Sequence, residues 1–172
     1  NLRATNENIR VDKLALQLAS TTASDSGDLG TIMVYQGATL LGSATIEGTS
    51  ATTTTVTLNQ STLTVPKDED VELTIKANLS DIGASSPGAA GALVGINWDG
   101  NPLTSSSNRA IGEASGSEVT ISGSDTSAAG VRLFNSFPTV AYISTPGDVS
   151  NGTNRDLLRF SVTADSSDDV GI

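Results

Sequence analysis

The clearest hydrophobic pattern in the chain lies between Leu63 and Leu79. Apolar residues at 71, 73, 75, 77 and 79 alternate with polar residues at 72, 74, 76 and 78. This two-residue period is typical of a β-strand with one buried and one exposed face. Pro66 has no N–H to donate to a ladder, so the charged residues 67–70 are expected to form a corner. The stretch predicts two strands joined by a corner in a two-layer β structure.

Most other apolar segments are short and bounded by turn residues. Within the first of them the parity of the apolar positions changes near Asp12 and Lys13, which predicts a β-bulge. The Gly37 link between two apolar runs predicts a hairpin. Because 131–134 and 139–143 carry aromatic and aliphatic residues, we expect both to be core strands. The expected strands are 8–18, 31–35, 40–46, 52–58, 92–98, 118–121, 131–134 and 139–143, whereas 105–116 is expected to be less regular.

Composition excludes several partners and environments. The 172 residues are enough to bury a core without disulfides, and there is no cysteine. The formal net charge is −10 and the basic residues are scattered, so phosphate backbones would be repelled and we expect no nucleic acid partner. No apolar run approaches the ~20 residues that span a bilayer, so we expect no membrane insertion. The chain begins with Asn1 rather than Met, which is consistent with a processed, exported product or a fragment.

Catalytic signatures are lacking. Without histidine and cysteine the chain cannot form a Ser-His-Asp or Cys-His nucleophile system or an imidazole metal site. Aromatic residues are only 3% of the chain, too few for the platforms of a typical glycosidase groove. There is also no Gly-rich phosphate loop followed by Lys and Ser or Thr. We therefore predict that the protein is not an enzyme, has no catalytic residues and requires no cofactor.

The end of the chain repeats its beginning. Residues 162–164 (VTA) match 2–4 (LRA), and 170–172 (VGI) match 9–11 (IRV) across a polar spacer that is one residue longer. This spacing of about 160 residues is typical of tandem surface domains. The alternative is chance recurrence of a short apolar strand followed by Asp and Ser in a chain of low complexity.

The composition shifts after Ile143, where Pro, Gly, Asn and Asp gather in residues 144–154. We therefore expect a β-sandwich domain over 1–143, a linker over 144–154, and a final strand within 155–172. That strand belongs to a following repeat or is donated to a neighbouring subunit. Its apolar residues are the expected assembly contacts, filling pockets on the acceptor: Leu157, Leu158, Phe160 and Val162.

Four segments carry a family resemblance: ENIRVDKLAL, VYQGATLLGSA, LTVPKDEDVELTIKANL and LLRFSVTAD. Together they resemble the immunoglobulin-like β-sandwich repeats of large bacterial cell-surface and S-layer-type proteins, over most of residues 6–165. The Gly- and Ser-rich region 83–130 departs from a compact domain of this type. The resemblance implies an all-β, immunoglobulin-like sandwich of antiparallel strands, with a C-terminal strand that extends beyond the domain.

If the final strand belongs to the next copy, the first domain lacks an equivalent strand and one of its sheet edges stays open. From this open edge and the resemblance we expect an extracellular, cell-surface structural protein. It would be a subunit or repeat of a self-assembling surface layer or filament, with its own copies or neighbouring repeats as partners. One alternative is an adhesin or carbohydrate-binding module with calcium-binding loops. Another is a viral or phage coat domain, which the sequence does not separate from a cellular surface subunit.

Acidic loops and glycosylation triplets are further candidate sites. Carboxylates are the ligands that Ca²⁺ prefers, and the group Asp165, Asp168 and Asp169 lies where a cation would stiffen a joint between domains. The alternative for each acidic cluster, including Asp25 with Asp28, is a solvated turn. Asn-x-Ser/Thr triplets place candidate glycans at Asn78 and Asn151.

Overall fold

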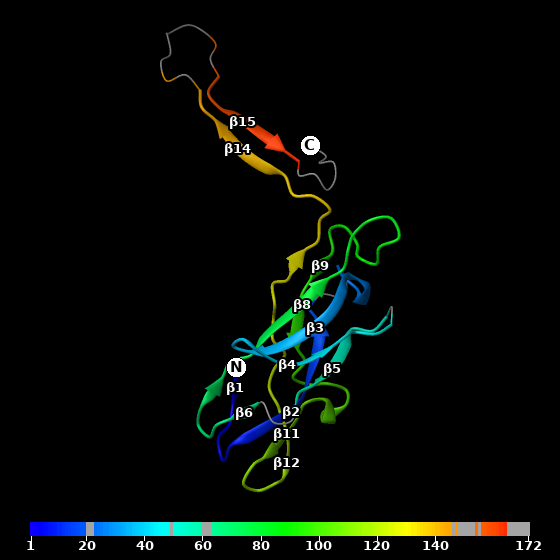
Figure 1. Cartoon of the computed structure of the whole chain (residues 1–172), viewed down its shortest axis with the longest axis vertical. Coiled ribbons are helices and arrows are strands. Elements are labelled where there is room, and N and C mark those ends of the chain that lie inside the picture. Colours follow the sequence, from blue (N-terminus) through cyan, green and yellow to red (C-terminus); the bar gives the residue numbers. More distant parts are fainter. Residues whose placement is uncertain are drawn as a thin grey trace. The chain divides into compact units, whose positions relative to one another are not determined.

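The computed structural model describes residues 1–19, 23–48, 50–59, 63–145, 147, 154 and 156–164. These residues form β-strands and two short 3-10 helices, η1 (Ser26–Asp28) and η2 (Ser105–Ser107) (Figure 1). The chain divides into two compact units, Asn1–Leu133 and Phe134–Ile172. In the part of the chain that is described, no helix is long and apolar enough to cross a membrane. The prediction of an all-β protein with antiparallel strands is confirmed.

The largest sheet of the first unit is built around β2 (Ile9–Leu18), which pairs with other strands along both of its edges. All of these pairs are antiparallel, so the expected strand 8–18 is the centre of a sheet rather than an edge. β5 (Thr53–Thr57) and β6 (Thr64–Val65) pair with one edge of β2, and β10 (Ile96–Trp98) and β11 (Arg109–Gly112) pair with the other. β12 (Glu118–Thr120) pairs with the far edge of β11.

The predicted bulge in β2 is confirmed. Arg109 of β11 lies opposite Lys13, whereas the next residue, Ala110, lies opposite Val11, so Asp12 is the extra residue in β2. Such a bulge resets which side chains face inward. The Asp12 side chain is buried and its carboxylate contacts Arg10 at 3.3 Å and Arg109 at 3.9 Å. The two guanidinium groups therefore compensate a carboxylate that lies inside the fold.

A second sheet has the strand order β4 (Thr39–Ala44), β3 (Leu29–Gln36), β8 (Thr74–Leu79), all antiparallel. β3 and β4 form the predicted hairpin, and Gly37 in its turn has a φ of +57°, a conformation that favours glycine. The alternation is also confirmed from 71 to 78, since the even-numbered residues are exposed and Val71, Leu73, Ile75 and Ala77 are buried or half-buried. Leu79, expected on the buried face, is exposed.

Two small sheets complete the first unit. β1 (Leu2–Arg3) pairs with β7 (Asp70–Val71), and β9 (Leu93–Val94) pairs with β13 (Val131–Arg132), both antiparallel. The expected strand 92–98 is thus interrupted at Gly95. A Cβ on Gly95 would lie 3.1 Å from both the Ala19 Cβ and the Gly130 Cα, so the backbones meet closely at this point.

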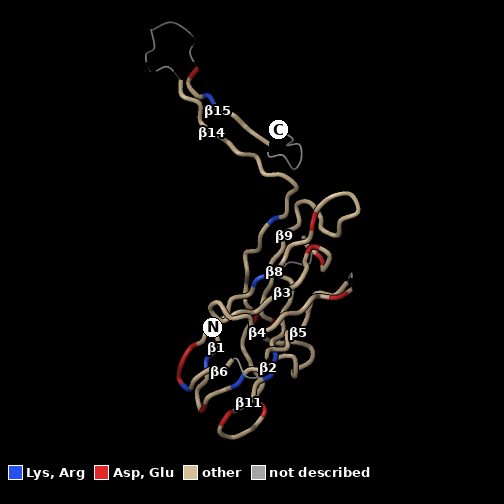
Figure 2. Tube along the Cα trace, viewed as in Figure 1, with Lys and Arg blue, Asp and Glu red and all other residues tan. Residues whose placement is uncertain are grey.

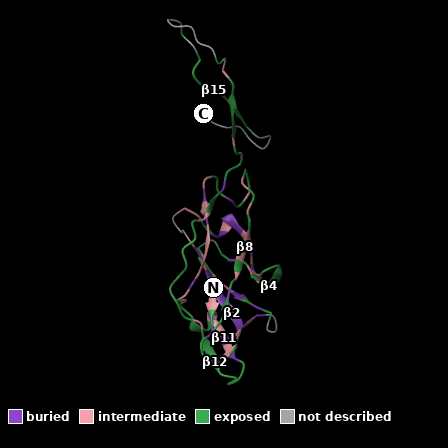
Figure 3. Ribbon diagram, turned by 90° about the vertical axis from the view of Figure 1, so that its left-hand side faces the viewer, coloured by how far each residue is buried: buried purple, intermediate pink, exposed green. Residues whose placement is uncertain are grey.

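Side chains from both larger sheets form one hydrophobic core (Figure 3). Leu14 and Leu16 come from β2, and Ile32 and Val34 come from β3. The core also receives Val56 from β5 and several residues of the loops and short strands. These contacts make the first unit a two-layer β structure, as predicted from the stretch 63–79.

The region 105–116 was expected to be irregular, but it contains β11, which is bound to the central strand β2. The prediction failed because the segment RAIG is short and owes its extended form to pairing with a strand about 100 residues earlier. Local pattern does not reveal such a distant partner.

The second unit contains an antiparallel pair, β14 (Thr139–Ile143) and β15 (Arg159–Thr163) (Figure 1). Residues 144–154, the expected linker, lie between these two strands in the sequence. Both strands were expected, but the expectation that 139–143 is a core strand is wrong, because all five of its residues are exposed. Aliphatic and aromatic residues predict an apolar strand, but they do not say what covers it.

Candidate functional site

The pair β14–β15 has two chemically different faces. Tyr142 lies directly opposite Phe160, and Val140 lies opposite Val162. Directly opposite residues project from the same face of an antiparallel pair. These four side chains therefore make a continuous surface, which we call the apolar face. The other face holds Thr139, Ala141, Ile143, Arg159, Ser161 and Thr163.

The apolar face is open to solvent. Its side chains are exposed by 67% at Tyr142, 57% at Phe160, 64% at Val140 and 36% at Val162. Figure 3 shows β15 mainly in the colour of exposed residues. Fully burying a large apolar side chain is worth about 1.5–3 kcal/mol, so leaving several exposed together forfeits considerable stabilisation. A patch of this kind marks an interaction surface.

Charge is confined to one end of the pair. β14 has no charged residue, and β15 has only Arg159, whose guanidinium lies 3.9 Å from the Asp156 carboxylate (Figure 2). Both of these side chains are more than half exposed, so this ion pair contributes little to stability. The apolar face itself carries no charge that would oppose its burial against another apolar surface.

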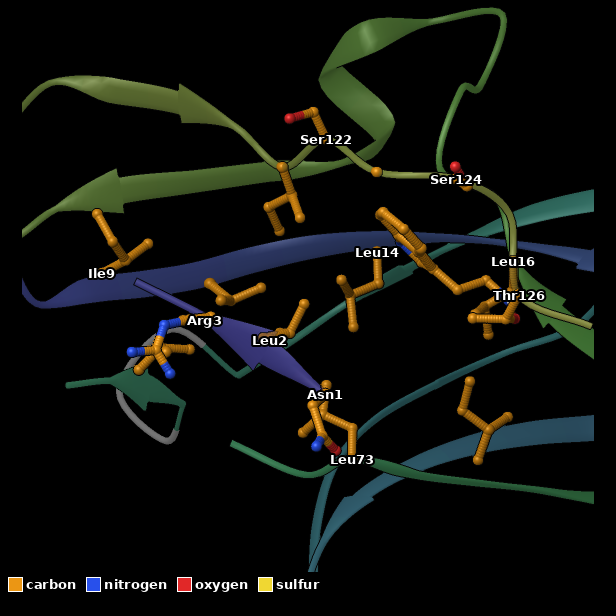
Figure 4. Close-up of a pocket in the computed structure, with 16 residues that line it drawn as sticks. Asn1, Leu2, Arg3, Ile9, Leu14, Leu16, Leu73, Ser122, Ser124 and Thr126 are labelled. Carbon is orange, nitrogen blue, oxygen red and sulfur yellow. The ribbon is translucent and has the colours of Figure 1, made fainter. Parts of the chain in front are cut away.

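The first unit contains a complementary feature, an apolar groove of about 500 Å³. Leu14 and Leu16 of β2 lie on one side of it and Leu2 of β1 and Leu73 on another (Figure 4). Ile75 of β8 also lines it. We call this cavity the groove. Its full lining is Asn1, Leu2, Arg3, Ile9, Val11, Leu14, Leu16, Val65, Leu73, Ile75, Trp98, Ile121, Ser122, Gly123, Ser124 and Thr126.

The groove borders an open sheet edge. β8 pairs with β3 along one edge, and within the described residues no strand pairs with its other edge. Ile75 lies in β8 and Leu73 lies just before it, and both line the groove. An unpaired strand edge presents N–H and C=O groups that can bind an additional strand. Groove and edge together are the components of a strand-acceptor site.

Trp98 closes one side of the groove and is held by a buried amide. Its indole Nε1 donates a hydrogen bond to Oδ1 of Asn108 at 3.0 Å. The same oxygen accepts the backbone N–H of Ala15 at 2.8 Å, and Nδ2 of Asn108 donates to the carbonyl of Asp99. Trp98 is thus anchored to the loop that carries Asn108.

The acidic side chains that the structure describes serve mainly as hydrogen-bond acceptors for the fold. Asp28 is buried and accepts the backbone N–H groups of Asp25 and Ala89 at 3.0 and 2.7 Å, while Asp25 accepts that of Gly27. These two acids form a capping box at η1. No group of three or more His, Cys, Asp or Glu that could hold a metal is found among the described residues.

Glu7 stabilises the turn between β11 and β12. Its Oε2 accepts the backbone N–H groups of Ala114 at 2.7 Å and Ser115 at 2.9 Å. The backbone and side-chain hydrogen bonds of Ser115, followed by the backbone hydrogen bond of Ala114, lower the pKa of Glu7 below its ordinary value. Hydrogen bonds to the charged form favour that form.

The sequence-predicted sites are distributed as follows. The expected assembly residues all lie in the second unit and are exposed, with Leu157 at 88% and Leu158 at 66% in addition to Phe160 and Val162. Asn78 is exposed on β8. The candidate calcium ligands Asp165, Asp168 and Asp169, and the candidate glycosylation site Asn151, lie outside the described residues.

Sequence reasoning missed two parts of this site. Tyr142 and Val140 were assigned to a core strand, because the segment 139–143 is apolar at four successive positions and shows no alternation. The groove was missed because its lining comes from segments far apart in the chain, from Leu2 to Thr126. Only the topology brings them together.

The chain stands apart in comparisons with known proteins. No protein-family model, no curated protein and no solved structure matches it.

Proposed function

We propose that this chain is a structural subunit, or one repeat, of a self-assembling extracellular surface layer or filament. Its first unit is an immunoglobulin-like sandwich, and its copies associate through β-strand edges. The observation that carries this proposal is the uncovered apolar face of β14–β15, whose central pair is Tyr142 and Phe160.

The energetics of a lone hairpin support association. A two-stranded β-hairpin is marginally stable in water, and at least a third strand or another packed element is needed for independent stability. Here the hairpin has an amphipathic register, with apolar pairs on one face and mostly polar pairs on the other. That pattern is typical of a sheet whose apolar face is packed on a core. Covering the face with another protein surface supplies the missing layer.

The composition is consistent with a structural role. The chain has no histidine or cysteine, and its net charge of −10 disfavours nucleic acid. Its Ser, Thr and Gly content matches short strands joined by many turns. The resemblance of four segments to bacterial surface-protein repeats agrees with an extracellular location.

The test is the mass of the whole chain in solution, measured by light scattering over a range of concentrations. We expect the mass to rise with concentration. Phe160→Asp, which places a charge on the apolar face, is expected to shift association to at least tenfold higher concentration. The matched control is Thr139→Asp, which adds the same charge to the other face of the hairpin on β14 and is expected to associate like the unmodified chain.

Two outcomes contradict the proposal. The first is a monomeric mass for the unmodified chain at every concentration. The second is an equal effect of Phe160→Asp and Thr139→Asp, because a role for net charge alone would then explain both. Thermal unfolding of each variant, followed by circular dichroism, shows whether the first unit remains folded.

A further inference from the structure

The short strand β1 points to the place where an additional strand fits. Leu2 lies opposite Val71 and Arg3 opposite Asp70 in the antiparallel pair β1–β7. In this register each step back from Leu2 corresponds to one step forward from Val71. A longer strand in the place of β1 would therefore run past residue 72 and along the open edge of β8, with residues opposite Leu73, Thr74, Ile75 and Lys76.

The internal similarity of the chain identifies a strand for this place. In the repeat expected from the sequence, Val162, Thr163 and Ala164 take the places of Leu2, Arg3 and Ala4. β15 is thus the longer counterpart of β1, since it continues backwards from Val162 through Phe160 to Arg159. Placing Val162 at the position of Leu2 sets Phe160 opposite Leu73, Arg159 opposite Thr74 and Leu158 opposite Ile75.

We propose that β15 of a second copy pairs antiparallel with the open edge of β8 in this register, with Phe160 and Leu158 entering the groove. This inference rests on the proposed self-assembly and specifies its contact. The donated strand replaces β1 at β7 and continues the sheet β4-β3-β8 by one strand.

The two faces of the donated strand match those of the acceptor. Leu73 and Ile75 line the groove, and Leu2 on the same face of β1 lines it too. Phe160 and Leu158, placed opposite Leu73 and Ile75, therefore project toward the groove. These two donor side chains are 57% and 66% exposed in the hairpin, so they gain burial by the transfer.

The outward face of the proposed pair is polar. Thr74 and Lys76 of β8 are exposed, and so is Glu72. Arg159 of the donor lies opposite Thr74 and diagonal to both Glu72 and Lys76. The Lys76 ammonium lies over the Tyr35 ring, 5.1 Å from its centroid, so Glu72 is the charged partner within reach of Arg159. The donor thus presents apolar residues to the groove and its positive charge to an acidic neighbour.

β1 is short, and within the described residues its pairing continues only at the buried Ala4, which bridges to Lys67 and accepts the backbone N–H of Asp68. The longer donor displaces it. β1 consists of two residues, and its one ion pair, between Arg3 Nη1 and Asp70 Oδ2 at 3.1 Å, joins side chains that are both more than half exposed. Exposed ion pairs of this kind contribute little to stability. β15 offers five strand residues in exchange for two.

The experiment is disulfide trapping between two single-cysteine variants of the whole chain, which has no cysteine of its own. Thr74→Cys is mixed with Arg159→Cys under mild oxidation. Opposite residues of an antiparallel pair have Cα atoms about 4.5–5.5 Å apart, within the range of a disulfide. We expect a covalent dimer that contains one chain of each kind, identified by mass spectrometry.

Two control mixtures test the position and the register. Thr39→Cys, on the exposed edge strand β4, is mixed with Arg159→Cys. Thr74→Cys is mixed with Thr163→Cys, which lies four residues, or about 13 Å, out of register. We expect at least fivefold less covalent dimer from either control.

The outcomes separate this inference from the proposed function. If the unmodified chain self-associates but the first mixture gives no more covalent dimer than the controls, the inference is wrong and self-assembly stands. A disulfide that forms only inside a single chain carrying both Thr74→Cys and Arg159→Cys also contradicts it, because the strand would then come from the same copy. A chain that stays monomeric overturns both proposals.

Discussion

Tyr142 of β14 lies directly opposite Phe160 of β15, so the two aromatic rings share one face of the hairpin. Opposite aromatic residues stabilise an antiparallel pair by roughly 0.2–1 kcal/mol relative to alanines. If this face is the association surface, Tyr142→Asp is expected to weaken self-association at least tenfold, as Phe160→Asp does. Analytical ultracentrifugation measures the change.

The matched control for Tyr142 is its neighbour Ala141, which projects from the other face. Ala141→Asp adds the same charge one residue away and is expected to leave association within about twofold of the unmodified chain. Equal weakening by both substitutions would show that the hairpin as a whole, rather than its apolar face, is the contact.

The buried amide of Asn108 holds together the region around Trp98. Replacing Asn108 with Ala leaves the N–H of Ala15 and the indole N–H of Trp98 without their acceptor. A buried donor without a partner costs about 1–3 kcal/mol. We expect Asn108→Ala to lower the free energy of unfolding in urea by at least this amount. Asn101→Ala, at an exposed position in the same loop, is expected to change it by less than about 0.5 kcal/mol.

β4 and β5 approach each other closely at Gly42. A Cβ at this position would lie 2.5 Å from the carbonyl oxygen of Thr57 and 3.1 Å from Val56 Cγ1. Gly42→Ala therefore forces the two strands apart, and we expect a loss of about 1–3 kcal/mol in the free energy of unfolding. Gly147→Ala is the control, because a Cβ there meets no atom within 4 Å. A neutral Gly42→Ala would show that the strands separate without cost.

The lowered pKa of Glu7 predicts an acid-dependent loss of stability. A carboxylate whose pKa is lower in the folded chain stabilises the fold above its unfolded pKa, and this contribution is lost as the pH falls through the folded pKa. The loss is thus expected to begin near the ordinary value of 4.5 and to continue below it.

Glu7→Gln isolates this contribution. The difference in unfolding temperature between the unmodified chain and Glu7→Gln is expected to be constant near neutral pH and to shrink as the pH falls below about 4.5. A difference that does not depend on pH between 3 and 7 would mean that the charge of Glu7 does not matter to the turn.

The local pattern of apolar and polar residues was sufficient to predict the strands that bury one face. The alternation around Val71 and Leu73 is present in the folded structure. The change of parity at Asp12 corresponds to a bulge, because one extra residue in a strand switches the side on which the apolar residues lie. Gly37 marks the hairpin turn for an equally local reason: the turn requires a positive φ, and glycine adopts it readily. Each of these features is determined within a few residues.

Features that depend on distant partners were not predictable in the same way. Arg109–Gly112 becomes a strand because β2 accepts it, and nothing in those four residues specifies that partner. The apolar character of Tyr142 and Phe160 was evident, but burial depends on what lies over them. The groove is likewise a product of topology, since Leu2, Leu73 and Trp98 meet only in the folded unit.

The contrast between β1 and β2 has a consequence for a single, unassociated chain under tension. A force on its first residues meets the two-residue pairing of β1 and then β2, which is bonded along both edges and holds the buried Asp12 between two arginines. Detaching β2 requires two ladders to break together, whereas β1 is paired along one edge only. We therefore expect the chain to lengthen by a few residues at low force before the sheet around β2 opens.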